Sequence, residues 1–206
     1  MNTQTGWPAR LTRTIAAQVK RTRTERKLSA QQLSDACAKL GLEMPRSVLA
    51  DLENGRRAHV SVAELLVLAR ALDVPPLLLV FPVGTDEETE ILPGADRAPF
   101  RGAQWFTGER PFPGPDDADY LDDIASDWGY ASGSPLWLYR SHNAAETGER
   151  EALRRAAGWE AQAAGAGGDS MAVGMASVLR EQADTRHRAA EDARRRAKEL
   201  GWLPPG

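Results

Sequence analysis

The sequence predicts a mainly α-helical protein with three parts: five short helices, an irregular middle and a C-terminal helical hairpin. Apolar residues recur at helical spacing over residues 11–80 and again over 135–200, with capping residues between the runs. Between these two parts, prolines and glycines are concentrated and an acidic run extends from Asp116 to Asp127. We therefore expect domains at 1–81 and 134–206, joined by an acidic linker over 82–133.

The first two helices are predicted from an apolar stripe and a capping pattern. Residues 11–26 carry Leu11, Ile15 and Val19 at helical spacing. Ser29 followed by Gln32 matches a capping box, in which each side chain bonds the backbone amide of the other residue. That second helix should run to about residue 40, where Gly41 suits a helix end.

Three further helices follow by the same reasoning. The third should begin near Pro45, point Leu49 and Leu52 inward, and end at Asn54-Gly55. Ser61 should cap a fourth helix over residues 62–72, and Pro75 should begin a fifth, short helix through residue 79.

The linker over 82–133 is expected to hold two short ordered pieces, a strand at residues 90–92 and a helix near 100–107. Its acidic run resembles a calcium loop only loosely, because the glycine and the final glutamate of such loops are missing, and a solvated linker is favoured.

The C-terminal part should form two long antiparallel helices. One is expected over 135–164 and the other from Asp169 or Ser170 to about residue 200, with a glycine-rich break between them. Each carries a thin apolar stripe that could pair with a second copy of the chain. The stripes are Leu136, Tyr139, Leu153, Ala157 and Ala164 in the first helix, and Met171, Met175, Val178, Ala189, Ala193, Ala197 and Leu200 in the second.

Charge is unevenly distributed along the chain. Residues 1–80 carry a net charge of +5, residues 81–140 a net charge of −8, and residues 141–206 a net charge of zero. The basic part could meet an anionic partner or could simply be a solvated surface, and charge alone does not decide between these readings.

Several functional classes are not expected. No apolar run is long enough to span a bilayer, and the N-terminus lacks the apolar core of a secretory signal. The single cysteine, Cys37, cannot form an internal disulfide, and together these features predict a cytoplasmic protein. The three histidines are scattered, and no phosphate loop or nucleophile elbow is present, so we expect no metal, no cofactor and no enzyme.

Residues 28–33 (LSAQQL) and 46–57 (RSVLADLENGRR), with the helix that follows, resemble the XRE family, the lambda-repressor and Cro-like (Cro/CI-type) helix-turn-helix regulators. The resemblance covers about residues 11–81. It implies a five-helix lambda-repressor-like DNA-binding domain, whose third helix enters the major groove of duplex DNA.

This resemblance and the pattern of inward leucines together give the expected DNA-binding residues. They are Gln31, Arg46, Ser47, Ala50, Asp51, Asn54, Arg56 and Arg57. Arg46 can pair with guanine or phosphate, Ser47 can donate to either, and Ala50 allows close approach to a thymine methyl group. The remaining polar residues suit phosphate oxygens, except for Asp51. That carboxylate needs Arg46 or Arg57 as a partner, or a cytosine amino group to accept from.

By the same resemblance, Arg23 should pair with Glu53 and tie the first helix to the end of the third. The segment from Leu33 to Pro45 is about one helical turn longer than is usual in the family, which bears on how the third helix docks.

The function expected from these patterns is sequence-specific binding of double-stranded DNA by a homodimeric transcription regulator. The alternative is a protein-interaction adaptor that keeps the helix-turn-helix fold as a scaffold and binds a partner protein through the hairpin. The hairpin could also pack on its own N-terminal domain in a monomer, or the C-terminal region could bind a small ligand.

Overall fold

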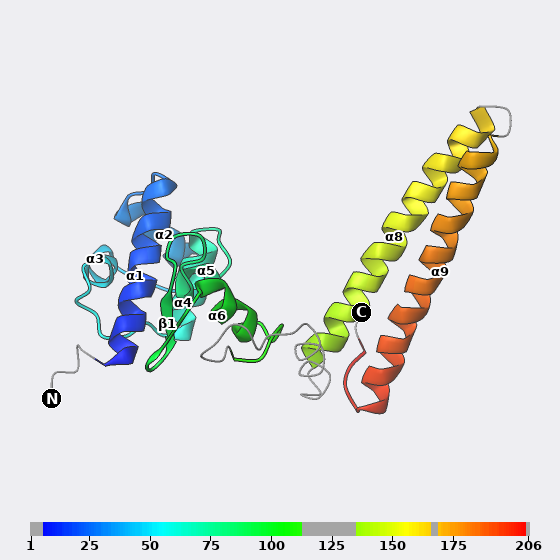
Figure 1. Ribbon diagram of the computed structural model, residues 1–206. Helices are drawn as coiled ribbons and strands as arrows, with labels where there is room; N and C mark the ends of the chain where they lie inside the picture. The colour runs from blue at the N-terminus through cyan, green and yellow to red at the C-terminus, as the bar shows by residue number, and fades with distance from the viewer. Residues whose placement is uncertain (1–5, 113–134, 166–168, 205–206) are drawn as a thin grey trace. The chain divides into compact units, whose positions relative to one another are not determined.

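The computed structural model describes residues 6–112, 135–165 and 169–204 and is mainly helical, which confirms the predicted fold class (Figure 1). The described residues up to Phe112 form one compact unit and those from Pro135 onward form a second. The acidic run from Asp116 to Asp127 lies outside the described residues, as does the rest of the expected linker beyond residue 112. The helices are α1 (Trp7–Glu25), α2 (Ala30–Lys39), α3 (Arg46–Glu53), α4 (Val62–Ala71), α5 (Leu77–Val80), α6 (Pro99–Phe106), α8 (Pro135–Gly165) and α9 (Ser170–Glu199).

Local capping chemistry sets the ends of the helices in the first unit. The capping box before α2 forms as predicted: the Gln32 amide donates to Ser29 Oγ over 3.1 Å, and the Ser29 amide donates to Gln32 Oε1 over 2.8 Å. Ser61 and Glu64 make a second capping box before α4. Helix α1 begins at Trp7, earlier than the apolar stripe indicates, with Pro8 in its first turn.

Large aliphatic side chains fill the core of the five N-terminal helices. Val19 of α1, Leu33 of α2, Leu49 and Leu52 of α3 and Leu68 of α4 are all completely buried. Cys37 joins this cluster as a free thiol, and burial raises its pKa. Every one of these helices contributes to one contiguous core, and Leu49 and Leu52 anchor α3 in it.

Residues 82–112 add a β hairpin and a helix to the same unit (Figure 1). Strands β1 (Thr89–Leu92) and β2 (Ala95–Arg97) pair antiparallel. The hairpin is held against α1, because Arg10 donates to both carboxylate oxygens of Glu90 over 2.6 and 2.7 Å. The short ordered pieces expected in the linker are therefore docked onto the helical domain.

Helix α6 and the β hairpin enclose a second, smaller hydrophobic core. Phe81, Ile91 and Ala103 are buried together there. Gly102 lies at their centre, and a Cβ at this position would come within 2.8 Å of side-chain atoms of both Phe81 and Ile91. Glycine is required at this position because the aromatic ring of Phe81 packs directly on the helix backbone.

The second unit is an antiparallel pair of long helices, α8 and α9, as predicted (Figure 1). Asp169 is the N-cap of α9, and its carboxylate accepts from the amides of Met171 and Ala172. No helix in the described ranges is long and apolar enough to cross a membrane.

Small residues form most of the contact between α8 and α9. The buried residues of α8 are Leu138, His142, Ala152, Ala156 and Ala163, and those of α9 are Ala172, Ala176, Leu179, Ala183, Ala190, Ala193 and Ala197. They recur at steps of three, four and seven residues, with one step of ten from His142 to Ala152, as expected for two helices wound on each other. The hairpin therefore has a thin, alanine-rich core.

The predicted apolar stripes differ from this buried contact. Ala193 and Ala197 of the second stripe are buried within the hairpin itself and cannot contact another molecule. In the first stripe, Leu136, Leu153, Ala157 and Ala164 are exposed. Tyr139 donates a hydrogen bond to the Leu203 carbonyl. Alanine occurs on several faces of both helices, so the sequence alone does not show which alanines face the partner helix.

A buried polar cluster interrupts the alanine-rich core. His142 has no exposed surface, and neither of its ring nitrogens has a hydrogen-bond partner. Its Nε2 atom lies 3.6 Å from Glu146 Oε1, which is also 3.5 Å from Arg194 Nη2. A buried imidazole without hydrogen bonds costs stability, which makes this part of the hairpin weaker than an all-apolar core would be.

Candidate nucleic-acid interface

The connection between α2 and α3 is fixed by a buried hydrogen bond. Ser34 Oγ on α2 donates to the Met44 carbonyl over 2.8 Å, and Met44 itself is buried. Gly41, just after α2, has φ +89°, a left-handed conformation that favours glycine at a helix end. The longer segment between Leu33 and Pro45 is thus an ordered turn that sets the start of α3.

Helix α3 has one buried face and one outward face. Pro45 is its N-cap and the helix begins at Arg46, one residue later than the sequence predicts. Leu49 and Leu52 are fully buried, whereas Arg46 and Ser47 in the first turn are exposed. Of the other expected contact residues, Ala50 and Asp51 are half-buried. The exposed first turn is the part of a recognition helix that reaches base edges.

Arg23 and Glu53 join α1 to the end of α3. Arg23 Nε and Nη2 donate to the two carboxylate oxygens of Glu53 over 2.6 and 2.7 Å, and Nη1 donates to the Leu28 carbonyl over 2.7 Å. Their side chains are only 16% and 7% exposed. The hydrogen bonds to Glu53 raise the pKa of Arg23 above its usual value. A bidentate pair with this little solvent exposure fixes geometry.

The segment after α3 carries Asn54 and two arginines. Gly55 has φ +69°, and Asn54 and Arg56 are exposed. Arg56 Nη1 lies 3.2 Å from Asp51 Oδ1, so Arg56 is the partner of the Asp51 carboxylate, in place of Arg46 or Arg57. This contact offsets the negative charge that Asp51 places on the outward side of α3.

Arg57 is held within the domain. Its Nη1 atom lies 2.8 Å from Glu64 Oε1 on α4, and both side chains are about four-fifths buried, with 21% and 18% exposed. Desolvation acts to raise the pKa of Glu64, but the Arg57 guanidinium and hydrogen bonds from Ser61 outweigh it and lower that pKa. Sequence reasoning missed Glu64, although its place three residues after Ser61 signals a capping box.

Two contacts hold the surroundings of these residues in place. Gln31, exposed in the first turn of α2, donates to Asp35 Oδ1 over 2.8 Å. Thr12 Oγ1, on buried Thr12 of α1, lies 2.9 Å from the Pro8 carbonyl and 3.2 Å from the Ala58 carbonyl, and its single hydrogen is shared between these two acceptors. Because Ala58 directly follows Arg57, this bond ties the loop after α3 to α1. The structure thus orders the loop that carries the two arginines.

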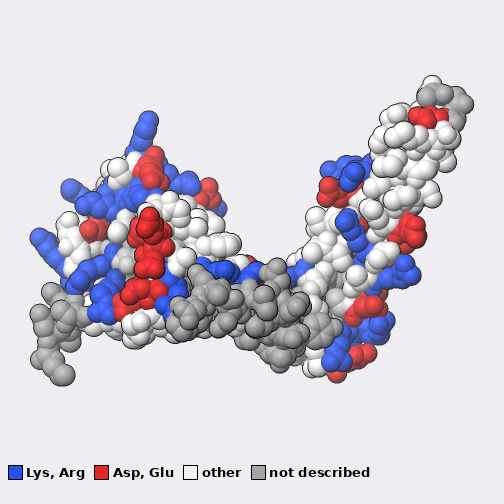
Figure 2. All heavy atoms as spheres, in the orientation of Figure 1, with Lys and Arg blue, Asp and Glu red and all other residues white. Residues whose placement is uncertain are grey.

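Charged side chains of both signs cover much of the visible face of this unit. Figure 2 shows Lys and Arg side chains around its periphery and a band of acidic side chains near the β hairpin. Within the described residues, no group of three or more His, Cys, Asp or Glu side chains is placed to hold a metal ion. The exposed polar groups of α3 and the loop after it therefore carry the candidate site.

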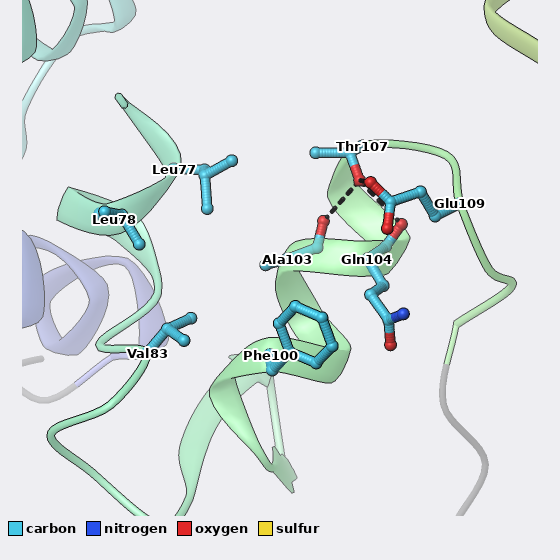
Figure 3. Close-up of a pocket in the computed structure, with 8 residues that line it drawn as sticks. All are labelled: Leu77, Leu78, Val83, Phe100, Ala103, Gln104, Thr107 and Glu109. Atoms are coloured by element: carbon cyan, nitrogen blue, oxygen red, sulfur yellow. Dashed lines mark hydrogen bonds between the residues drawn. The ribbon is translucent and has the colours of Figure 1, made fainter. Parts of the chain in front are cut away.

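A small apolar pocket lies elsewhere on the unit, between α5 and α6 (Figure 3). Its volume is about 160 Å³, and its lining residues are Leu77, Leu78, Val83, Phe100, Ala103, Gln104, Thr107 and Glu109. Some polar groups of the pocket already bond to one another, because Thr107 Oγ1 donates to the Ala103 carbonyl and contacts Glu109. The pocket offers mainly hydrophobic contact.

Helices α2 and α3 have the features of a helix-turn-helix unit. They are two short helices joined by an ordered turn, and the second helix exposes its first turn. Residues 14–79 match the family of helix-turn-helix domains. No curated protein and no solved structure matches the sequence. The family match covers α2, the turn and α3, and at this general level it indicates a DNA-binding regulator.

Proposed function

We propose that the protein is a sequence-specific regulator of transcription, of the XRE (Cro/CI) type, that binds double-stranded DNA through α3 as a cytoplasmic homodimer. The observation that carries this proposal is the division of α3 into a fully buried face, with Leu49 and Leu52, and an exposed first turn with Arg46 and Ser47. A helix held in this way can enter the major groove without loss of core contacts.

Each outward group has a chemical role in this proposal. Arg46 pairs with a guanine edge or a phosphate, and Ser47 donates to a neighbouring acceptor. Ala50, with its short side chain, allows close approach to a thymine methyl group. Gln31 and Asn54 donate to phosphate oxygens at the two ends of the motif.

The two arginines after α3 have different roles. Arg56 is exposed and reaches phosphate while it neutralises Asp51. Arg57 acts mainly by positioning, because its ion pair with Glu64 holds the loop against α4. We therefore expect removal of Arg56 to weaken binding on all sequences, and removal of Arg57 to lower the thermal stability of the domain as well.

Selection of bound sequences from a random duplex pool, followed by affinity measurements, tests the proposal. Arg46→Ala should reduce affinity for the selected site by roughly tenfold to a hundredfold, about 1–3 kcal/mol, and relax preference at one base pair. Arg70→Ala is the matched control, since this arginine is exposed on α4 and belongs neither to α2, nor to the turn, nor to α3. Equal effects of the two substitutions, or no enriched sequence, would contradict the assignment.

A protein-interaction adaptor is the second candidate. It is favoured by the pairing of both Arg56 and Arg57 with carboxylates, which reduces the positive potential beside α3. Binding to random duplex DNA at low salt separates the two functions, because an adaptor would not be retained.

A further inference from the structure

Charge is unevenly distributed along the C-terminal hairpin. Residues 156–179, on both sides of the turn, contain only two charged residues, Glu160 and Asp169. In contrast, residues 180–199 contain 12 Asp, Glu, Lys and Arg residues. Figure 2 shows the same division, since the end where α8 and α9 are joined is mostly free of coloured side chains. An end with so few charges is unusual for a part of a highly charged surface hairpin that faces only water.

One uncharged row of side chains runs along α9. It consists of Met171, Met175, Val178, Gln182, Thr185 and Ala189, and we call it the α9 stripe. The steps of four and three residues place these side chains on one side of the helix. Met171 is 70% exposed and Val178 is 49% exposed. A shallow groove along its middle is lined by Val178, Glu181, Gln182, Thr185 and Arg186, so one residue of each charge borders the stripe.

The hairpin does not use the α9 stripe for its own packing. Met171, Met175, Val178, Gln182 and Ala189 each directly precede a residue that is buried against α8, such as Ala172 after Met171 and Leu179 after Val178. Successive helix residues are rotated by about 100°. The stripe therefore faces about a quarter turn away from the contact with α8, on a side of the hairpin that α8 does not cover.

A glycine beside the stripe leaves its backbone open to close approach. Gly174 follows Met171 by three residues and precedes Val178 by four, so it adjoins the stripe. Nothing lies within 4 Å of a Cβ added there, so no contact within the hairpin requires a glycine. A glycine inside a helix costs up to about 1 kcal/mol relative to alanine. Gly174 therefore leaves room for a second backbone to approach the stripe closely.

We propose that the α9 stripe is the interface at which two copies of this chain pair. In a two-fold contact the same patch faces itself, so an uncharged patch brings no like charges together.

The area also fits a reversible dimer. From Met171 to Ala189 the stripe is about 27 Å long, and together with the adjoining side of α8 it belongs to a face about 20 Å wide, which gives roughly 500 Å² per copy. Two such faces bury about 1,000 Å² or more, near the lower limit for specific interfaces. We therefore expect a dimer that dissociates on dilution within the micromolar range.

The test is the mass of the full chain in solution, measured without DNA by sedimentation from low to high micromolar concentration. We expect a dimer at high concentration for the unmodified chain. Val178→Glu should give a monomer at every concentration, because the new carboxylate of one copy would face the same carboxylate of the other copy across the two-fold contact. Met171→Glu should do the same, and at 70% exposure it cannot disturb the hairpin core.

Val173→Glu is the matched control. Val173 is 55% exposed, like Val178, but it lies five residues earlier on α9 and so points about 140° away. It should leave the dimer intact, and circular dichroism should show unchanged helix content in all three variants. A monomeric unmodified chain, a dimeric Val178→Glu variant, or equal dissociation by Val173→Glu would overturn the proposal. Because no DNA is present, a failure of DNA binding would leave these results unaffected.

Discussion

The helix-turn-helix unit and the hairpin are both helical, but they are stabilised differently. The first buries large aliphatic residues, among them Val19, Leu49 and Leu52, around one core. The second buries mainly alanines and a histidine without a hydrogen-bond partner, and leaves Met171 and Val178 exposed. Burial of a leucine removes far more apolar surface from water than burial of an alanine. The first unit is therefore stabilised by a thick aliphatic core of its own, whereas the thin core of the hairpin contributes less.

The largest expected effect comes from truncating this aliphatic core. Leu52→Ala should lower the free energy of unfolding of the first unit by about 2–5 kcal/mol, because it leaves a cavity at a fully buried site. Leu153→Ala on α8 is the control, since Leu153 is 41% exposed and should change stability little. Denaturant unfolding followed by circular dichroism measures both, and a large effect of Leu153→Ala would contradict the comparison.

Two glycines should respond with opposite signs. Gly102→Ala should cost about 1–3 kcal/mol, because its Cβ would overlap Phe81 and Ile91 in a packed core. Gly158→Ala should stabilise α8 by roughly 0.5–1 kcal/mol, because nothing lies within 4 Å of an added Cβ and alanine is the better helix former. Thermal unfolding of the two variants shows whether each substitution raises or lowers the stability. A stabilising effect of Gly102→Ala would show that the second core is loosely packed.

Two bidentate ion pairs allow a comparison at nearly equal geometry. Arg23 and Glu53 in the first unit are 16% and 7% exposed, whereas Arg180 and Glu160 in the hairpin are 57% and 42% exposed. A double-mutant cycle with alanine should give a coupling above about 0.5 kcal/mol for the first pair. The coupling of the exposed pair should be smaller and should weaken with salt. Equal couplings would mean that burial does not strengthen the contact.

The smallest effect is expected from acid. The Arg10 guanidinium and the Gly94 amide lower the pKa of Glu90 to about 2. A carboxyl with a lowered folded-state pKa stabilises the fold above its unfolded-state pKa of about 4.3, and that contribution disappears as pH falls towards 2. The stability difference between the unmodified chain and Glu90→Gln should therefore shrink as pH decreases from 5 to about 2. A difference independent of pH would indicate that the carboxylate charge is not involved.

Local chemistry made much of the fold predictable. Ser29 with Gln32, Gly41, Gly55 and Asp169 mark helix ends through hydrogen bonds and backbone preferences that act within a few residues. The inward direction of Leu49 and Leu52 followed from helical spacing in the same way. These signals give the position of α3 and the list of candidate contact residues.

Contacts between distant residues were less predictable. The docking of the β hairpin depends on Arg10 and Glu90, eighty positions apart, and no local pattern indicates that contact. The partners of Asp51 and Arg57 depend on which of several nearby charges the tertiary fold brings closest. In the hairpin, alanines on several faces allow more than one helix contact, so the buried face became evident only from the structure.

Binding of the full chain to duplex DNA as a function of salt is the most direct test of the central proposal that α3 binds DNA. The proposal predicts binding at low salt with an affinity that falls steeply as salt rises, because contacts with phosphate release counterions. Arg56→Ala should lower the slope of log affinity against log salt by about one. Absence of binding at low salt, or an affinity that does not change with salt, would contradict the proposal.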